Sequence, residues 1–600
     1  MPSPPQAGSP TSPTPIRLLD YVLRYRWRYA VGLSALLVAS FVVMLPPLVI
    51  QQAIDGIAQR ADPSTLLGYV GALLALALVE STFRYTSRRL LSGTSRLVEY
   101  DIRTELARRL MHLDQRFYLT AQTGDLMARC TNDLQRVRDM LGPALQDVFR
   151  LPAMMLLGFV LMATIDVALA VVSVAYFPLI ALVIILLKTA MERKYRAVQD
   201  QFGALATRVQ ENISGIRTIK AYAQDEAEVA TFTRAEEEMV RRTMGWARYS
   251  AGLMAFFGVA AGASVVLVLW VGGHKVVAGD LTVGQFVQFI AYLAILSSPV
   301  LSLSWTVSLL QQGAVGWKRV KEVLEARPEI ADPPRPVHLD RIRGDVEFEH
   351  VTFVYGGQPV LRDVNLKVPA GTSVALVGET GAGKTTLVNL LVRLYDPTEG
   401  RITLDGVDLR ELPLDELRAA VGFVPQESFL FSEPLRANIA YARPDLDAAE
   451  VEHALATSQL ATDLPQLTHG LDTVVGERGI TLSGGQKQRA ALARALLKAP
   501  PVLVLDDALS HVDTHTEEEI LRRLREFMGQ RTTFLIAHRT STVAAADAIV
   551  VLAGGAIVET GTHDELVAAG GVYTRFYRWQ LLEEQLKEAG VAGRNGEERA

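Results

Sequence analysis

The sequence predicts a multidomain chain: an all-α transmembrane domain of six helices with long cytosolic helical extensions, followed by an α/β domain of the P-loop type. Three observations lead to this fold class. Six stretches before residue 311 carry no charge or almost none, and the connectors after the second and fourth stretches are long and rich in arginine. From Val346 onward, strand-like runs alternate with turns and then with helical segments, as in an α/β domain.

Length and composition narrow the possible classes of protein. The chain has 600 residues, several times the ~150 residues expected of one domain. Charged residues make up 21% and hydrophobic residues 49%, which excludes a disordered chain. The net charge of −5 disfavours a nucleic-acid partner. The single cysteine, Cys130, excludes an internal disulfide and a cysteine-based zinc cluster, and it fits a reducing cytosolic compartment.

Composition also divides the chain along its length. The first fifteen residues contain six prolines and no apolar run, so we expect a disordered cytosolic leader rather than a secretory signal. Near Val323 the composition changes abruptly, and the run ADPPRP that follows predicts a stiff, helix-breaking linker. The predicted parts are a leader (1–15), a transmembrane domain with two intracellular loops (16–330), a linker (331–342), a nucleotide-binding domain (343–575) and a polar tail (576–600).

Each uncharged stretch is long enough to cross a bilayer as a helix, which takes ~20 apolar residues. Buried helices of a soluble core are the alternative, but the runs Val167–Leu187 and Tyr249–Gly273 span 21 and 25 residues, more than such helices need. Glu80 and Arg84 interrupt the second stretch and could pair on one helix face, either structurally or beside a polar substrate group. The six expected spans are about 29–52, 65–87, 146–165, 167–187, 249–273 and 285–310.

The connectors predict the topology. The long connectors, 89–145 and 189–247, carry nine Lys and Arg residues each, whereas the three short ones carry only Arg60 and Lys275. Cationic connectors stay in the cytosol, so both long connectors and both termini should face it. Neither long connector has a strand pattern or an apolar core of its own, which favours helices that run out of the membrane and back over independent cytosolic domains.

A phosphate-binding motif opens the second half of the chain. Residues Gly378–Thr385 match G-x-x-x-x-G-K-T between a strand, Ser373–Val377, and a helical run, Thr386–Leu394, so backbone N–H groups should converge on phosphate. Lys384 should lie against the β- and γ-phosphates of ATP, and the Thr385 hydroxyl should bind Mg²⁺. The nucleotide-binding residues predicted here are Gly378, Glu379, Thr380, Gly381, Ala382, Gly383, Lys384, Thr385 and Thr386.

Two further motifs belong to the same chemistry. The apolar strand Val502–Leu505 ends in Asp506, where a P-loop enzyme needs a carboxylate to hold the metal. Before it, Leu482–Gln486 (LSGGQ) opens the helix Lys487–Leu497 with a Ser hydroxyl and two glycine N–H groups. This helix start is a second candidate anion site, and nothing in its own chain is obviously placed to fill it.

LSGGQ between a P-loop and a strand ending in aspartate resembles the ATP-binding cassette (ABC) superfamily, and the spans ahead of it resemble type IV ABC exporters over residues 16–575. The resemblance implies that Tyr355 stacks on adenine and that Gln426 is the Q-loop residue, a catalytic group and metal ligand. By the same resemblance, Glu477 lies in the X-loop, Ser510–Asp513 form the D-loop and His538 is the catalytic switch histidine. In the membrane half, the runs 123–133 and 211–226 resemble the two intracellular loops, and 272–286 the connection between spans five and six.

The resemblance also implies a partner chain. In ABC proteins two cassettes close head to tail over ATP, so the LSGGQ of one chain completes the P-loop site of the other. One cassette in this chain therefore implies a second half-transporter, with ATP and Mg²⁺ as cofactors. The residues that would serve the partner's nucleotide are Ser483, Gly484, Gly485, Gln486 and Asp513.

One departure from the family pattern concerns the catalytic base. The family usually has Glu after the metal-binding aspartate, whereas this chain has Asp507, and its D-loop reads Ser-His-Val-Asp where the family usually has Ser-Ala-Leu-Asp. A shorter carboxylate is withdrawn from its water, so hydrolysis at this chain's own P-loop should be slow. This asymmetry resembles the degenerate-site half of heterodimeric bacterial exporters. A homodimer that tolerates Asp507 remains the alternative.

The sequence therefore predicts ATP-driven export of hydrophobic or amphipathic solutes across a bacterial inner membrane, as one half of a multi-pass dimer surrounded by lipid. Two alternatives stay open: a lipid flippase of the same architecture, and a mainly regulatory nucleotide-binding subunit. Cargo is not readable, since span aromatics such as Phe256 and Phe289 could line a cavity or simply pack. His511 and His515 beside the D-loop suggest a metal only weakly.

Overall fold

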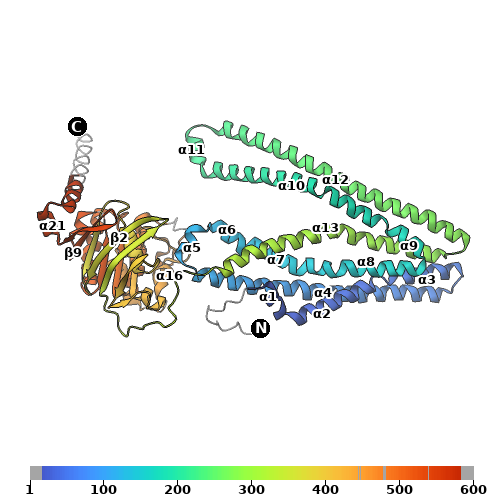
Figure 1. Cartoon of the computed structure of the whole chain (residues 1–600), viewed down its shortest axis with the longest axis horizontal. Coiled ribbons are helices and arrows are strands. Elements are labelled where there is room, and N and C mark those ends of the chain that lie inside the picture. The colour runs from blue at the N-terminus through green and yellow to red at the C-terminus, as the bar shows by residue number, and fades with distance from the viewer. Residues whose placement is uncertain (1–15, 444, 446, 477–481, 538, 583–600) are drawn as a thin grey trace. The chain divides into compact units, whose positions relative to one another are not determined.

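The computed structural model describes residues 16–582 apart from 444, 446, 477–481 and 538. Within helices, the side chains of 176–181, 184, 185, 188, 298–301, 304, 514, 540 and 541 are left out of the description. The chain divides into two compact units. The helical unit holds residues up to His112 together with Gln122–Ala326, and the α/β unit holds Leu113–Ala121 together with residues from Arg327 onward (Figure 1). The sequence placed 113–121 in the first domain, and the domain boundaries given above remain predictions.

Long helices build the helical unit, as the sequence predicted, and α2 packs along α4 while α10 packs along α12 (Figure 1). A helix satisfies its own backbone hydrogen bonds, so it can continue from lipid into water without a break. The α-helices of this unit are α1 (Leu18–Arg24), α2 (Arg26–Val42), α3 (Pro46–Ala58), α4 (Pro63–His112), α6 (Thr123–Ala128), α7 (Leu134–Asp139), α8 (Leu145–Ile165), α9 (Val167–Val174), α10 (Tyr176–Ser214), α11 (Ile216–Ala221), α12 (Asp225–Ala278) and α13 (Val283–Glu325).

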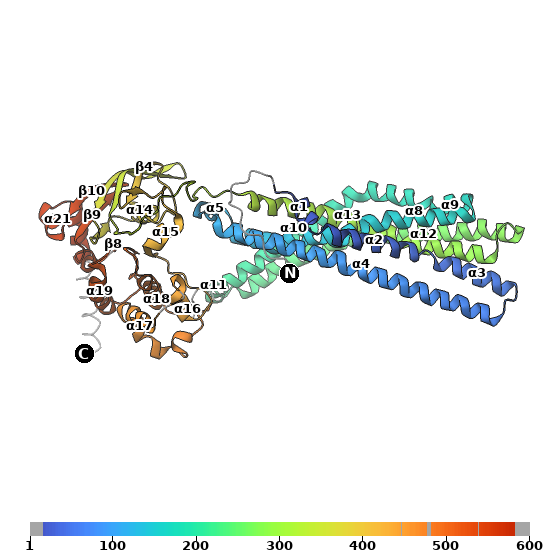
Figure 2. The ribbon, with the colours of Figure 1, turned by 90° about the horizontal axis from the view of Figure 1, so that it is seen from below.

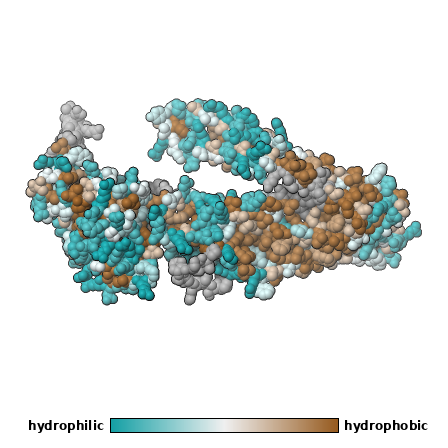
Figure 3. Space-filling view, viewed as in Figure 1, coloured by the Kyte–Doolittle hydropathy of each residue, from teal (hydrophilic) through white to brown (hydrophobic). Residues whose placement is uncertain are grey.

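All six predicted spans lie on helices, namely α2–α3, α4, α8, α9–α10, α12 and α13. Within the described residues, four helical stretches meet strict length and hydropathy limits for crossing a membrane: 26–58, 63–112, 123–165 and 225–278. The expected fourth and sixth spans include positions whose side chains are left out. Apolar surface covers a broad band of the helical unit (Figure 3). Leu74, Leu78 and Val266 of its long helices are largely exposed.

The first expected span is not one unbroken helix. α2 ends at Val42, residues 43–45 form a turn with shorter-range hydrogen bonds, and α3 begins at Pro46. Proline has no N–H to donate but suits the first turn of a helix, so the Pro46–Pro47 pair ends one helix and starts the next. Asp166 has a similar part between α8 and α9, where its carboxylate accepts from the Leu169 N–H at 2.8 Å.

Close backbone contact joins α13 to the segment that connects α6 with α8. That segment contains two π-helical turns, η1 (Arg129–Asp133) and η2 (Met140–Ala144). Gly313 and Gly316 of α13 face these turns without side chains, and a Cβ on Gly316 would lie 2.8 Å from the Asp133 carbonyl oxygen. Next to them, Arg319 forms an ion pair with the buried Asp133 at 2.7 Å. Glycine therefore sets how closely these helices approach.

Two sheets form the α/β unit. An antiparallel sheet has the order β2-β1-β4-β5, and a six-stranded sheet, parallel in its centre, has the order β10-β9-β3-β8-β7-β6. Sequence patterning predicted this strand and helix alternation. The strands are β1 (Val346–Tyr355), β2 (Gln358–Val368), β3 (Ser373–Val377), β4 (Glu399–Leu404), β5 (Val407–Asp408), β6 (Val421–Val424), β7 (Val502–Asp506), β8 (Thr532–Ile536), β9 (Ala548–Ala553) and β10 (Ala556–Gly561).

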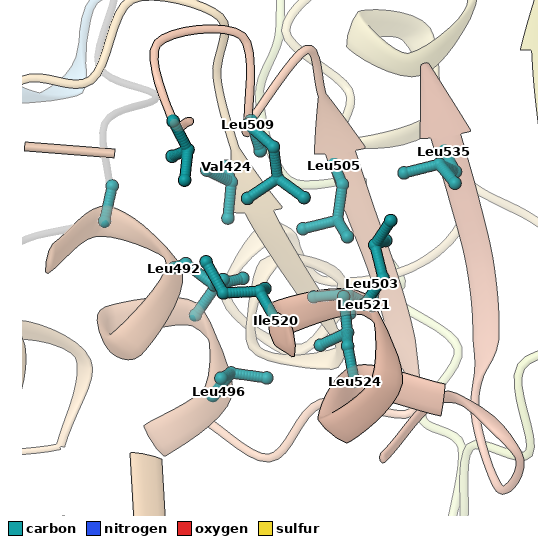
Figure 4. Packing of buried hydrophobic residues seen from close by; sticks show 14 of the residues in the cluster. Val424, Leu492, Leu496, Leu503, Leu505, Leu509, Ile520, Leu521, Leu524 and Leu535 are labelled. Carbon is teal, nitrogen blue, oxygen red and sulfur yellow. The ribbon is translucent and has the colours of Figure 1, made fainter. Parts of the chain in front are cut away.

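The six-stranded sheet is covered on both faces. Because strand side chains alternate, Leu503, Leu505 and Leu535 join one apolar core and Val504 and Phe534 the other. Figure 4 shows the first core, where leucines of α18 and α19 meet those of β7 and β8. Figure 2 shows α14 on the opposite side, toward β4. The helices are α5 (Gln115–Thr120), α14 (Lys384–Leu391), α15 (Leu414–Ala420), α16 (Leu435–Ile439), α17 (Ala448–Thr457), α18 (Gly484–Leu497), α19 (Thr514–Met528), α20 (Thr540–Val543) and α21 (His563–Ala569).

Replacing Gly313 by Ala should destabilise the helical unit, although Ala is ordinarily the better helix former by about 1 kcal/mol. A Cβ there would lie 2.4 Å from the Met140 Cβ and 3.0 Å from the Arg136 carbonyl oxygen. Overpacking of this kind costs about 1–3 kcal/mol, which should lower the apparent melting temperature of the detergent-solubilised chain. Gly262→Ala in α12 is the matched control, because its Cβ would meet nothing within 4 Å. Equal melting temperatures for the two variants would contradict this account.

Candidate nucleotide-binding site

The loop between β3 and α14 has glycine at three positions with positive φ, Gly378, Gly381 (φ of 85°) and Gly383, and at the first and last of these a Cβ would also clash. Gly378 has φ of 156° and a Cβ there would lie 2.2 Å from the Leu552 carbonyl oxygen. Gly383 caps α14 with φ of 100°, in the left-handed region, and a Cβ there would lie 2.6 Å from Leu361. These glycines let the chain turn tightly from a buried strand into a helix. The first N–H groups of α14 consequently point into the loop, as phosphate binding requires.

Lys384 lies inside this loop and is only 8% exposed. Its Nζ donates to the carbonyl oxygens of Gly378 at 2.7 Å and Glu379 at 3.0 Å. Burial lowers the pKa of Lys384 below its ordinary value, while the carboxylates of Asp506 and Asp507 act in the opposite direction. The two carboxylates thus favour the charged ammonium next to the expected phosphate position.

Thr385 and Asp506 form a pair of oxygen ligands of the kind Mg²⁺ prefers. The Thr385 hydroxyl donates to Asp506 Oδ1 at 3.2 Å, so the two oxygens are neighbours, and Asp506 is only 2% exposed. Among the described residues, no group of three or more His, Cys, Asp or Glu side chains could hold a metal by itself, and His511 and His515 belong to no such group. One hydroxyl and one carboxylate leave room for phosphate oxygens and water, which fits a magnesium nucleotide.

A cavity of about 230 Å³ opens over these residues. It joins the P-loop to Gln426 and to the carboxyl ends of β7 and β8, so residues far apart in the sequence surround one space. Val360 and Ile536 also line it, and neither was predicted, because both look like ordinary apolar strand residues in the sequence. The lining residues are Val360, Thr380, Gly381, Gly383, Lys384, Thr385, Thr386, Gln426, Asp506, Asp507 and Ile536.

Asp507 reaches the cavity through an unusual backbone conformation. Its φ is 49°, a left-handed value that non-glycine residues seldom adopt and that is frequent where function requires strain. Its N–H donates to the Ile536 carbonyl oxygen at 3.0 Å, and its Oδ2 accepts from Gln426 Nε2 at 3.4 Å. The structure therefore brings together the two described residues to which the sequence assigned catalytic roles.

Tyr355 lies at the end of β1 and is 48% exposed. Its ring meets that of Tyr395 edge-to-face, with centroids 6.4 Å apart, and Tyr395 also contacts Phe353. Burial is the main cause that raises the pKa of Tyr395, with smaller contributions from Tyr355 and Asp114. The Tyr355 ring is thus supported from one side and remains available for stacking.

The LSGGQ segment lies apart from this cavity. Ser483 caps α18: its hydroxyl accepts from the Gln486 N–H at 3.2 Å, and Gln486 Oε1 accepts from the Ser483 N–H at 3.0 Å. Gly484 and Gly485 form the first turn, whose N–H groups have no partner within the helix. Asp513 similarly caps α19, accepting from the Thr516 N–H at 3.0 Å, and this hydrogen bond lowers its pKa. None of these residues is among the described lining of the P-loop cavity.

Two residues with expected roles, His538 and Glu477, lie outside the described part of the chain. The remaining expected residues of the loop, Gly378, Glu379 and Ala382, surround Lys384 without lining the cavity. The roles of all these residues are taken up below as proposals.

Comparisons with known proteins match both units. The description "ABC transporter transmembrane region" fits residues 29–300, and "ABC transporter" fits residues 361–510. The chain is 36% identical to a probable multidrug resistance ABC transporter ATP-binding/permease protein, YheI, of Bacillus subtilis, over 94% of this chain and 98% of that protein. It is 34% identical to an ATP-dependent lipid A-core flippase of Syntrophus aciditrophicus, over 96% of each. A solved bacterial Atm1-family ABC exporter with ATP bound matches with a TM-score of 0.79 and 29% identity, over 92% of this chain and 99% of that one.

Replacing Lys384 by Ala should weaken ATP binding at this chain's P-loop by at least about tenfold, since a charge-assisted contact to phosphate is lost. Titration of the purified chain with a fluorescent ATP analogue measures the dissociation constant. Lys367→Ala, at an exposed lysine paired with Glu347, is the control and should leave affinity unchanged. An unaltered affinity in the Lys384 variant would show that the ammonium does not meet the phosphates.

Proposed function

This chain belongs to the ABC transporter family, with a membrane region and an ATP-hydrolysing cassette in one polypeptide, and from that premise we propose that it exports hydrophobic or amphipathic solutes as half of a dimer. The observation that carries the proposal is a P-loop cavity attached to an exporter-type helical unit. ATP-driven export agrees with relatives named as multidrug transporters and as lipid A-core flippases. For this chain, hydrophobic solutes are the first candidate cargo and lipid the second.

A dimer follows from the separation of the two anion-binding helix starts. We infer that the α18 N-terminus serves a nucleotide of another chain, which is supported by the described lining of the P-loop cavity, where no residue of Ser483–Gln486 occurs. The capping box holds Ser483 and Gln486 against each other and leaves the first N–H groups of the helix directed outward. A second cassette, facing head to tail, would bring its phosphates there.

We assign each predicted site residue of the cassette a role in binding or hydrolysing magnesium ATP. Lys384 would hold the β- and γ-phosphates, the loop N–H groups would surround them, and Tyr355 would stack on the adenine. Thr385, Asp506 and Gln426 would hold Mg²⁺, which neutralises charge on the phosphate oxygens. His538 and Gln426 would orient groups around the attacking water, and Asp507 would act as the general base.

Asp507 makes this chain's own site the weaker one. Its side chain is one methylene shorter than Glu, about 1.5 Å, whereas a general base must come within ~2.6–3.2 Å of its water. The positive φ and the contacts to Ile536 and Gln426 fix its backbone and carboxylate, which limits any compensating movement. The intact LSGGQ segment can still complete a partner's site. We therefore favour a heterodimer whose partner carries Glu at this position, over a homodimer or a purely regulatory subunit.

Segment Leu113–Ala121 is the proposed link from nucleotide to membrane helices. It follows directly on α4, and its Asp114 both caps α5 and accepts hydrogen bonds from the N–H groups of Glu329 and Ile330. Arg116 adds an ion pair with Glu329 at 2.6 Å. All these residues belong to the α/β unit, so movement of the cassette would carry the end of α4 with it.

The distribution of charged residues supports a proposal for the orientation of the chain in the membrane and for one contact with the cargo. The arginine-rich ends of the long helices support a cytosolic α/β unit, and we propose the bacterial inner membrane as the location of the helical unit. Within α4, Glu80 and Arg84 pair at 3.3 Å, with Arg84 67% exposed and Glu80 mostly covered. An intramembrane pair with one exposed member is a candidate contact for a polar group of the cargo.

Asp507→Glu should raise the ATPase rate of the purified chain about 10- to 100-fold, because the intact signature of one copy can complete the P-loop site of another. Phosphate release by the chain in lipid nanodiscs measures the rate. The Asp507→Asn variant controls for charge and should bind ATP without hydrolysing it. Wild-type turnover as fast as that of the Glu variant would refute the weak-site proposal.

Transport should occur when this chain is co-expressed with a half-transporter that has Glu at the corresponding position. Everted membrane vesicles should then accumulate a fluorescent amphipathic dye with ATP, and Ser483→Ala in this chain should abolish accumulation by removing a contact at the partner's site. Thr562→Ala removes a comparable helix cap at α21 and should have no such effect. Flipping of a labelled lipid without dye transport would identify the flippase instead.

A further inference from the structure

Gln488 is a buried polar side chain whose described hydrogen bonds all go to one loop. It lies in α18, two residues after the LSGGQ segment, and is only 2% exposed. Its amide contacts Asp507, Ser510 and His511, which follow the metal-binding strand β7. A buried amide needs such partners, because leaving a buried donor or acceptor unsatisfied destabilises the fold.

The hydrogen-bond pattern fixes the orientation of both side chains. The backbone N–H of His511 donates to Gln488 Oε1 at 2.9 Å, so Oε1 is the acceptor end of the amide. The donor end, Nε2, then faces Ser510 Oγ at 2.9 Å and His511 Nδ1 at 3.0 Å. Because Nε2 can only donate, His511 Nδ1 accepts in this contact, and the Ser510 hydroxyl also lies 3.2 Å from Nδ1.

The same network reaches Asp507. The Ser510 hydroxyl donates to the Asp507 carbonyl oxygen at 3.0 Å, and Gln488 Nε2 lies 3.4 Å from that oxygen. The loop that holds the proposed general base is therefore bonded to one side chain of the signature helix at Ser510 and His511, and that side chain also approaches the Asp507 carbonyl oxygen.

Backbone packing supports the contact. A Cβ on Gly485 would lie 2.9 Å from the His511 carbonyl oxygen, and a Cβ on Gly484 would lie 3.4 Å from the His511 Cβ. The two glycines of LSGGQ thus admit His511 as well as leaving their N–H groups open to phosphate. A larger residue at Gly485 would separate the loop from the helix.

We infer that Gln488, Ser510 and His511 form a latch that makes the Asp507 loop and the start of the signature helix move as one body, with His511 and Gln488 as positioning residues. The inference rests on the proposed head-to-tail dimer. There, the Asp507 loop belongs to this chain's site and the signature helix to the partner's. A change at one nucleotide is consequently passed to the other through the latch.

An alanine at position 511 would keep the backbone N–H bond to Gln488 but lose the imidazole acceptor. The histidine therefore gives the buried amide an additional partner.

Hydrogen exchange of the full chain tests the latch directly. In His511→Ala and Gln488→Met, amides in 483–488 and 507–513 should exchange about tenfold faster than in the wild type, since local opening becomes easier. His511→Asn supplies an acceptor oxygen near the Nδ1 position and should restore slow exchange. Unchanged exchange in His511→Ala, or no rescue by Asn, would overturn the latch. If Gln488→Met fails to fold, the two variants at the exposed residue His511 are sufficient to test the latch.

Function is tested on the same variants. ATP affinity of the P-loop should stay within about twofold of wild type, while ATP trapped in the closed dimer should dissociate several-fold faster in His511→Ala and at the wild-type rate in His511→Asn. Equal dissociation from all variants would overturn the coupling role. The weak-site proposal would fail if the wild-type chain hydrolysed ATP fast. Hydrogen exchange and ATP dissociation do not measure hydrolysis, so the latch and the weak site are tested separately.

Discussion

The hydrogen bond from the Thr385 hydroxyl to Asp506 joins two motifs 121 residues apart, and the rest of the nucleotide site is arranged around it. It exists because β3 and β7 run parallel in one sheet, with β8 between them, so their carboxyl ends meet at one edge. Glycine at Gly378 and Gly383 then permits the sharp turn that brings Lys384 to the same place. Burial of both strands on two faces fixes this geometry, since a shift in register would move each Leu and Val side chain into the opposite apolar core and disrupt the packing of both cores.

The membrane spans and the phosphate-binding residues could be predicted from the sequence, for reasons that differ between the two units. Lipid requires long apolar helices, so the spans on α4, α8 and α12 followed from uncharged runs alone. Phosphate binding requires glycine, lysine and a hydroxyl at fixed spacing, so Lys384 and Thr385 followed from local sequence. Both signals are local, and neither depends on the packing of distant residues.

What sequence reasoning missed depends on tertiary contact. The break at Pro46 was not predicted, although the proline is plain in the sequence. The spans were identified as runs without charge, and a proline interrupts helical hydrogen bonding without adding a charge. The membership of Leu113–Ala121 in the α/β unit depends on Asp114 meeting a segment more than two hundred residues away. Gln488 resembles any polar residue of an exposed helix, and its burial follows only from the position of the Asp507 loop.

Asymmetry between the two nucleotide sites can arise from one methylene only if the surroundings of Asp507 are stiff. A mobile loop would let the shorter carboxylate advance to the water, and the substitution would then have little effect on hydrolysis. The left-handed φ, the N–H bond to Ile536 and the bonds that tie Ser510 and the Asp507 carbonyl to Gln488 each oppose that advance. If this chain pairs with a partner as proposed, the contacts that would weaken its own site are the same ones that would hold its signature helix rigid for the partner. Slow hydrolysis on one side and completion of the other side would then have a single structural cause.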